Sequence, residues 1–224
     1  MIPLRSSERV YSRTAVTGSL IALNVLIFLY QATLTPYALN QFVTQWGIVP
    51  DQMRGMELLT LLTSMFLHGG WLHLGGNMLF LWVFGRSIED LIGGPRFLAF
   101  YLICGVAAGI VQVIASPYSR IPTIGASGAI AGVMGAYLVK FPRSRIVMLI
   151  PIFFFLTTAE IPAVIVLLYW FGLQFISGLW SLGVTNYTGG GTAWFAHIGG
   201  FLTGVLLIRV FPARQRWRPW YEGE

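Results

Sequence analysis

The stretch Gly125-Ala126-Ser127-Gly128 places a serine between glycines at the start of a short apolar run. A helix needs about 20 residues to cross the hydrocarbon core of a bilayer, yet this run ends at Lys140. Ser127 is therefore expected to lie below the membrane surface. A polar side chain at such a depth costs free energy unless it has a partner, so partners for Ser127 must come from other helices.

The composition is that of an integral membrane protein. The chain of 224 residues is 56% hydrophobic and 10% charged, with a mean hydropathy of +0.72, whereas soluble domains carry roughly 25% charged residues. The net charge of +6 comes from basic residues that flank the apolar runs, which predicts contact with lipid and no nucleic-acid partner. The single cysteine, Cys104, lies in an apolar run and has no internal disulfide partner. No metal or cofactor site is expected.

Six apolar runs are expected to cross the membrane as helices, which predicts an all-α polytopic membrane protein with a six-helix bundle. The runs cover residues 15–34, 71–84, 97–115, 127–139, 161–180 and 196–211. A further stretch, 146–156, is interrupted by Pro151 and is too short to span. We expect it to lie at the interface or to lead into the fifth helix. The expected organisation is an N-terminal segment (1–14), a membrane domain (15–211) and a basic-aromatic tail (212–224).

The distribution of basic residues predicts the orientation of this bundle. With six spans, twelve of the fourteen Lys and Arg residues fall on the side of the N-terminus, and only Arg54 and Arg120 fall on the other. The positive-inside rule then places both termini in the cytoplasm. The long loop 35–70 is expected to fold against the outer membrane surface. The glycine-rich loop 183–192 is expected to be a mobile cap.

In this topology three helices begin on the outer side and carry polar residues at one level. His73 and Asn77 open the second helix, Ser127 opens the fourth and His197 opens the sixth. At 1.5 Å per residue, His73, Ser127 and His197 each lie ~20 Å above the first basic residue at the inner end of their own helix. All three are therefore expected about 10 Å below the outer surface.

These residue types are those that nucleophilic catalysis requires. A serine becomes a nucleophile when a neutral histidine takes its proton, so Ser127 and His197 are the candidate catalytic pair. His73 and Asn77 are four residues apart on one helix face. With the backbone N–H of Ser127, they are candidate donors to an oxyanion. No acidic residue lies near the outer ends of these helices, which favours a dyad.

Glycines predict close approach between the fourth and sixth helices. Gly125 and Gly128 leave room for a substrate backbone and permit unusual dihedral angles at the turn. Gly128 with Gly132, and Gly200 with Gly204, have the GxxxG spacing that lets two helix backbones pack closely. Such packing is what a hydrogen bond between the serine and the histidine requires.

Three stretches together resemble the rhomboid family of intramembrane serine proteases. They are His68-Gly69-Gly70-Trp71-Leu72-His73-Leu74-Gly75-Gly76-Asn77, then Gly125-Ala126-Ser127-Gly128, then Ala196-His197-Ile198-Gly199-Gly200 with Gly204. They are similar to the family patterns HxxxxHxxxN, GxSG and AHxxGxxxG in order, spacing and helix placement. The resemblance implies hydrolysis of peptide bonds in single-pass transmembrane protein substrates near the outer face of a bacterial cytoplasmic membrane. It also implies a structural or water-organising role for His68.

The chain departs from the family pattern at two places. Family members often carry an aromatic residue four positions after the serine, packed under the histidine, and here that position is Ala131. The histidine is therefore expected to find other support, for instance from its own helix. The Trp-Arg pair common in the first loop of the family is absent around residues 46–54.

Two alternatives compete with a protease. One is a non-catalytic rhomboid-like protein that binds membrane proteins or acts as their chaperone, although such relatives typically lose the serine or the histidine. The other is a small transporter or channel, which would carry polar residues along a path through the core. The sequence identifies neither a substrate nor an oligomeric state. We expect the fifth helix, with loop 183–192, to open for substrate.

Overall fold

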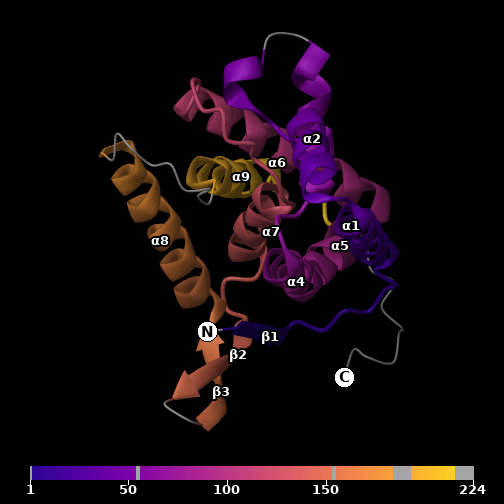
Figure 1. Ribbon diagram of the computed structural model, residues 1–224. Helices are drawn as coiled ribbons and strands as arrows, with labels where there is room; N and C mark the ends of the chain where they lie inside the picture. The colour runs from indigo at the N-terminus through magenta and orange to yellow at the C-terminus, as the bar shows by residue number, and fades with distance from the viewer. Residues whose placement is uncertain (1, 54–55, 153–154, 184–192, 215–224) are drawn as a thin grey trace, which may run out of the picture.

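The computed structural model describes residues 2–53, 56–152, 155–183 and 193–214, and all structural statements below concern these ranges. The chain is mostly helical, with one small sheet (Figure 1). The elements are β1 (Ile2–Ser6), α1 (Ala15–Thr33), α2 (Pro36–Trp46), η1 (Pro50–Gln52), η2 (Met56–Leu59), α3 (Thr60–Thr63), η3 (Ser64–Phe66), α4 (Trp71–Phe80), η4 (Leu81–Gly85), α5 (Arg86–Ile92), α6 (Gly94–Ala115), α7 (Ser127–Lys140), β2 (Arg145–Ile152), β3 (Phe155–Pro162), α8 (Ala163–Gly183) and α9 (Trp194–Leu207).

Helix α7 lies at the centre of the bundle, with α4, α6 and α9 around it and α8 at the edge (Figure 1). Every residue of α7 from Gly128 to Tyr137 is buried. A helix that is apolar on all faces is typical of the interior of a bundle. The short apolar run that opens at Ser127 is therefore surrounded by other helices.

Three helices are long and apolar enough to cross a membrane by themselves: α1, α6 and residues Ala163–Trp180 of α8. These spans confirm three of the six that the sequence predicts. Helices α7 and α9 are apolar but shorter, with 14 residues each.

The second predicted span, 71–84, ends too early. The helix that begins as α4 continues through a π-helical turn, η4, into α5 and stops at Ile92. Arg86 stays inside this continuous helix, with its guanidinium 4.3 Å from the ring centre of Trp82. A cation over an aromatic face is stabilising, which favours an arginine at this position within the helix.

The prediction of an all-α protein is wrong at one end of the bundle. Residues 145–152 and 155–162 form a β-hairpin, and β1 pairs with its first strand to give an antiparallel sheet of order β1-β2-β3. The stretch 146–156 was expected to lie at the interface or to lead into the fifth helix; it belongs to this hairpin, whose second strand leads directly into α8 at Ala163. Ile161, where the fifth helix was predicted to start, pairs with Ile146 inside the sheet. The predicted N-terminal segment 1–14 likewise contributes a strand.

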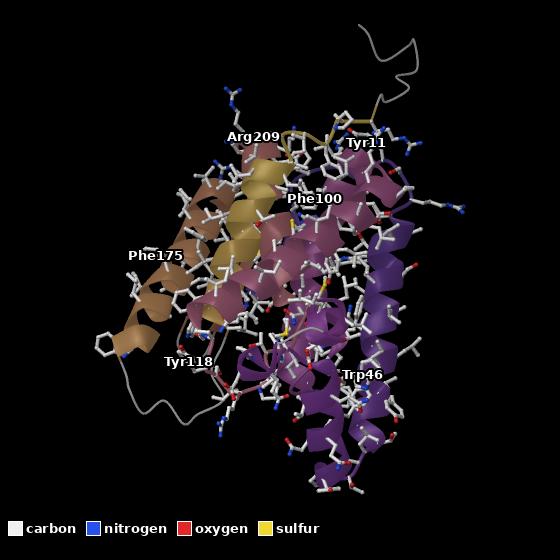
Figure 2. The ribbon with its side chains drawn as sticks, turned by 90° about the horizontal axis from the view of Figure 1, so that it is seen from above. Tyr11, Trp46, Phe100, Tyr118, Phe175 and Arg209 are labelled. Atoms are coloured by element: carbon white, nitrogen blue, oxygen red, sulfur yellow. The ribbon has the colours of Figure 1, made fainter. Side chains whose placement is uncertain are left out.

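The ends of the helices fall into two groups (Figure 2). Tyr11 and Arg209 lie at one end of the bundle, and Trp46 and Tyr118 lie at the other.

At the first end, two buried carboxylates on α5 hold the segment that leads into α1. Glu89 accepts hydrogen bonds from the backbone N–H groups of Val16 and Thr17, at 2.9 and 2.7 Å, and Asp90 accepts two from Ser12. A carboxylate at a helix N-terminus satisfies free N–H groups and complements the helix dipole.

At the other end, the predicted loop 35–70 is a series of short helices, α2 to η3, packed beside the bundle (Figure 1). An isolated β-bridge between Ile48 and Thr123 ties this loop to the segment that precedes α7. Most of the predicted mobile cap, 184–192, and residues 215–224 of the predicted tail lie outside the described residues.

Candidate active site

The segment before α7 places Ser127 by means of a glycine turn. Gly125 has φ +122°, a conformation that residues with a side chain rarely adopt, and its N–H donates to the carbonyl of Ser64 at 2.9 Å. This bond ties the turn to η3, at the end of the folded loop. Ser127 is then the first residue of α7 and is half-buried.

Helices α7 and α9 touch backbone to backbone at their glycines. A Cβ atom added to Gly200 would lie 2.0 Å from the carbonyl oxygen of Gly128, and one added to Gly204 would lie 1.9 Å from that of Gly132. No side chain fits at either position, because real Cβ contacts are longer than 3.0 Å. The predicted packing glycines therefore lie at the contact between these two helices.

This contact brings Ser127 and His197 together across 70 residues of sequence. Oγ of Ser127 is 2.7 Å from Nε2 of His197, within hydrogen-bonding distance. His197 is 7% exposed, and its other ring nitrogen, Nδ1, lies 2.7 Å from Oε1 of Gln174 on α8. Both ring nitrogens of the buried histidine therefore have partners.

His73 and Asn77 lie on α4, across the cavity from the serine. The backbone N–H of Gly69 donates to Nδ1 of His73 at 3.3 Å, so the proton of the neutral ring lies on Nε2. A Cβ atom on Gly125 would lie 2.8 Å from this Nε2 and 3.5 Å from Nδ2 of Asn77. Nδ2 of Asn77 is buried and has no hydrogen-bond partner among the described residues. Two N–H donors that have no acceptor within the described part of the chain therefore converge beside the turn that carries Ser127.

The serine, both histidines and the asparagine line one cavity of about 720 Å³. Apolar side chains form much of its wall, including Phe80, Ile130, Met134 and Trp170. An apolar pocket with a few convergent polar groups is typical of an enzyme active site. Among the described residues, no group of three or more His, Cys, Asp or Glu side chains is placed to hold a metal ion.

His68 lies in the connection before α4, and its backbone is held by Gln31 of α1. The amide of Gln31 accepts from the N–H of His68 at 3.0 Å and donates to its carbonyl at 3.2 Å. The ring of His68 packs edge-on against that of His73, with centroids 5.2 Å apart. Burial lowers the pKa of His68 to about 4, so its ring is neutral at physiological pH.

Three residues outside the sequence motifs also contact α9. On α8, Gln174 bonds to the ring of His197, and Trp170 packs against that ring with centroids 5.6 Å apart. On α6, Gln112 accepts from the N–H of Ala196 at 3.1 Å. The expectation that the histidine is supported by its own helix holds only for Trp194, whose ring lies edge-on at 6.4 Å. The closer support comes from α8.

The fold and the site define a multi-pass integral membrane protein with a serine and a histidine paired inside its helical bundle. The family model described as Rhomboid domain matches residues 55–214. This is most of the chain, and the chain therefore belongs to the rhomboid family, as the three sequence motifs predict.

Several relatives of known name are similar over this region. Rhomboid protease GluP of Bacillus subtilis (strain 168) is 35% identical over 150 residues, which are 67% of this chain and 25% of that protein. Rhomboid protein 1, mitochondrial, of Saccharomyces cerevisiae is 28% identical over 153 residues, 66% of this chain and 40% of the relative. Presenilin-associated rhomboid-like protein A, mitochondrial, of Danio rerio is 32% identical over 196 residues, 86% and 46% respectively. The match thus spans between a quarter and less than half of the length of these relatives.

Proposed function

We propose that this chain is an intramembrane serine endopeptidase that cleaves single-pass transmembrane proteins with a Ser127–His197 dyad. The observation that carries the proposal is the 2.7 Å contact between Oγ of Ser127 and Nε2 of His197 in a cavity between helices. Each of these polar side chains costs free energy to bury in an apolar bundle. Helix packing alone therefore does not explain why two of them, 70 residues apart in sequence, are in contact. The family membership and the protease named among the relatives support the same reaction class.

In the proposed reaction, Oγ of Ser127 attacks the carbonyl carbon of the scissile peptide bond while its proton passes to Nε2 of His197. The tetrahedral intermediate collapses, the C–N bond breaks, and the imidazolium gives its proton to the leaving amine. Water then attacks the acyl-enzyme, again with His197 as base. The products are a carboxylate and an amine, and the serine is regenerated.

The oxyanion of each intermediate needs donors that are in place before it forms. We assign this role to Nε2–H of His73, Nδ2–H of Asn77 and the backbone N–H of Ser127. The unpartnered, buried amide nitrogen of Asn77 supports this assignment, because a buried donor without an acceptor is costly unless a ligand supplies one.

For the membrane arrangement we propose six crossings, made by α1, α4–α5, α6, α7, α8 and α9. Both termini would lie in the cytoplasm and the site would open outward from a bacterial cytoplasmic membrane. The charge distribution supports this orientation, as does the position of Tyr11 and Arg209 at the same end of the bundle (Figure 2).

The function is tested with purified protein in liposomes that contain a single-pass substrate. We expect wild type to cleave the substrate and Ser127→Ala and His197→Ala to cleave none. A fluorophosphonate probe should label wild type on Ser127 and leave both variants unlabelled. Substrate binding without cleavage or labelling by wild type would refute the protease and favour the non-catalytic alternative.

The orientation has an independent test, because Cys104 is the single cysteine and is buried. In a Cys104→Ala background, Tyr118→Cys and Arg143→Cys place new thiols at exposed positions predicted to lie on opposite sides. A thiol reagent that does not cross membranes should label only the first variant in intact cells. Labelling of only the second would reverse the proposed orientation.

A further inference from the structure

Gln174 is a buried amide on the apolar helix that forms the edge of the bundle. Helix α8 is 21 residues long, and Gln174 is 7% exposed, whereas its neighbours Phe175 and Ile176 are 48% and 64% exposed. A glutamine side chain costs free energy to bury unless its oxygen and nitrogen are hydrogen-bonded. The contacts of this amide therefore explain why it faces inward.

The two contacts of Gln174 fix which of its atoms faces the histidine. Its Nε2 lies 3.4 Å from the carbonyl oxygen of Trp170, one turn earlier on α8. A carbonyl oxygen only accepts hydrogen bonds, so the atom that faces it must be the amide nitrogen. The amide oxygen Oε1 consequently faces Nδ1 of His197 at 2.7 Å.

This assignment also fixes the tautomer of the catalytic ring. Oε1 of Gln174 only accepts, so Nδ1 of His197 must carry the proton and donate. Nε2 is then the unprotonated nitrogen, and it faces Oγ of Ser127 at 2.7 Å. The hydroxyl of Ser127 donates to it, which is the state that a general base requires.

Trp170 packs against the same ring. The indole and imidazole ring centres are 5.6 Å apart with planes 39° apart. Trp170 and Gln174 are four residues apart, so they lie on one face of α8. Family members often support the histidine with an aromatic residue four positions after the serine, where this chain has Ala131. Here the face of α8 that carries Trp170 and Gln174 supports the ring.

We propose that Gln174 is a positioning residue of the catalytic machinery, which completes a Ser127–His197–Gln174 triad from α8. The proposal rests on the proposed protease function. Through this bond Gln174 fixes the tautomer and rotation of the base and accepts from the imidazolium formed during the reaction. Helix α8 is thereby a part of the catalytic apparatus as well as a wall of the cavity.

The test compares three substitutions on α8 in the full-length protein in liposomes. Gln174→Met keeps the length and shape of the side chain but accepts no strong hydrogen bond, and Gln174→Glu keeps an acceptor. Phe175→Leu is the matched control, because Phe175 lies on the outer side of α8 (Figure 2). Thermal unfolding in detergent verifies that all three proteins fold.

We expect Gln174→Met to lower kcat/KM by about 10- to 100-fold, mainly in kcat, which is the effect of losing one hydrogen bond to a developing charge. Gln174→Glu should recover at least part of this rate. An anion beside Nδ1 favours the imidazolium, so the acid limb of the pH profile should move to higher pH in this variant. Among the described residues, the other titratable group that acts on the ring is His73 on α4, which is unchanged in all three proteins. Phe175→Leu should match wild type in rate and pH profile.

The failures of the two proposals are distinguishable. Wild type that neither cleaves nor reacts with the fluorophosphonate probe would refute the protease itself. An active wild type with Gln174→Met at the same rate would show that Gln174 only fills space. A loss in Gln174→Met that Gln174→Glu does not recover would also overturn the triad.

The tautomer gives a readout without any turnover. The chain has three histidines, so imidazole ¹⁵N spectra of histidine-labelled protein are simple, and His197→Ala assigns the signals of the catalytic ring. We expect wild-type His197 to be protonated on Nδ1, and Gln174→Met to be a mixture of both tautomers. Protonation on Nε2 in wild type would refute the proposed hydrogen-bond chain.

Discussion

Substitution of Gly200 by alanine tests whether close contact between α7 and α9 is what holds the candidate dyad together. The new Cβ atom would lie 2.0 Å from the carbonyl oxygen of Gly128, and contacts below 3.0 Å essentially never occur. The two backbones must therefore separate by about 1 Å at this level, because backbone atoms cannot rotate away as a side chain can.

The displacement is large compared with the tolerance of the site. Gly128 follows Ser127 directly, and Gly200 is one helical turn after His197, so the shift acts at the level of the dyad. A separation of about 1 Å would lengthen the 2.7 Å contact between Oγ and Nε2 beyond hydrogen-bonding range. Misplacement on this scale costs roughly 100-fold in rate, and the overpacked contact costs about 1–3 kcal/mol of stability.

The assay measures substrate cleavage and fluorophosphonate labelling of Ser127, with thermal unfolding measured on the same samples. Gly18→Ala in α1 is the matched control, because a Cβ atom there meets nothing within 4 Å. We expect Gly200→Ala to lose labelling and cleavage together and to unfold at a lower temperature, with Gly18→Ala unchanged. Wild-type labelling and unfolding by Gly200→Ala would refute the argument from close packing.

Three further substitutions test separate parts of the structure. Gly125→Ala should lower kcat/KM by roughly 100-fold, because its Cβ atom would lie 2.8 Å from Nε2 of His73 and because the backbone φ of +122° is strained for alanine. Normal turnover by this variant would show that the turn relaxes without cost. Glu89→Gln should destabilise the protein by about 1–3 kcal/mol in thermal unfolding, since the amide N–H₂ is a donor that would face the backbone N–H donors at the start of α1. An unchanged unfolding transition would contradict the capping role of Glu89. Asp51→Asn should change stability by less than about 1 kcal/mol, because its partner Arg120, at 3.1 Å, is 87% exposed. A larger loss would mean that this pair orders the two loops that it joins.

The sequence predicts the start of several helices well, because a basic residue or a glycine turn stands just before the apolar run. The predicted starts at Ala15, Trp71 and Ser127 coincide with those of α1, α4 and α7. It fails at 146–156, where a short apolar run is equally compatible with a helix and a strand. The run forms a strand because it pairs with β1, for example Leu149 with Ile2. A partner so distant in sequence leaves no signal in the sequence around 146–156.

For the site, the charge pattern predicted that Ser127 and His197 begin their helices at one level. The glycine spacing predicted that these two helices pack closely, so the two side chains were expected to meet. Gln174 was missed because an amide changes neither net charge nor any of the motifs. A signal was nevertheless present. Gln31, Gln112 and Gln174 all interrupt apolar helices, are at most 9% exposed, and bond to another element. A buried amide in a membrane helix is therefore worth selecting as a candidate contact.

The sheet has a consequence for how the chain folds during synthesis. β1 pairs with β2, Ser6 bonds to Tyr137 of α7, and the N–H of Arg145 donates to Oγ of Ser7 across 138 residues of sequence. At a synthesis rate of about 5–20 residues per second, the β1 segment waits on the order of 10 s before its partner strand exists. The strand at the beginning of the chain can thus dock only after α7 and the hairpin have been made, so this end of the bundle closes late.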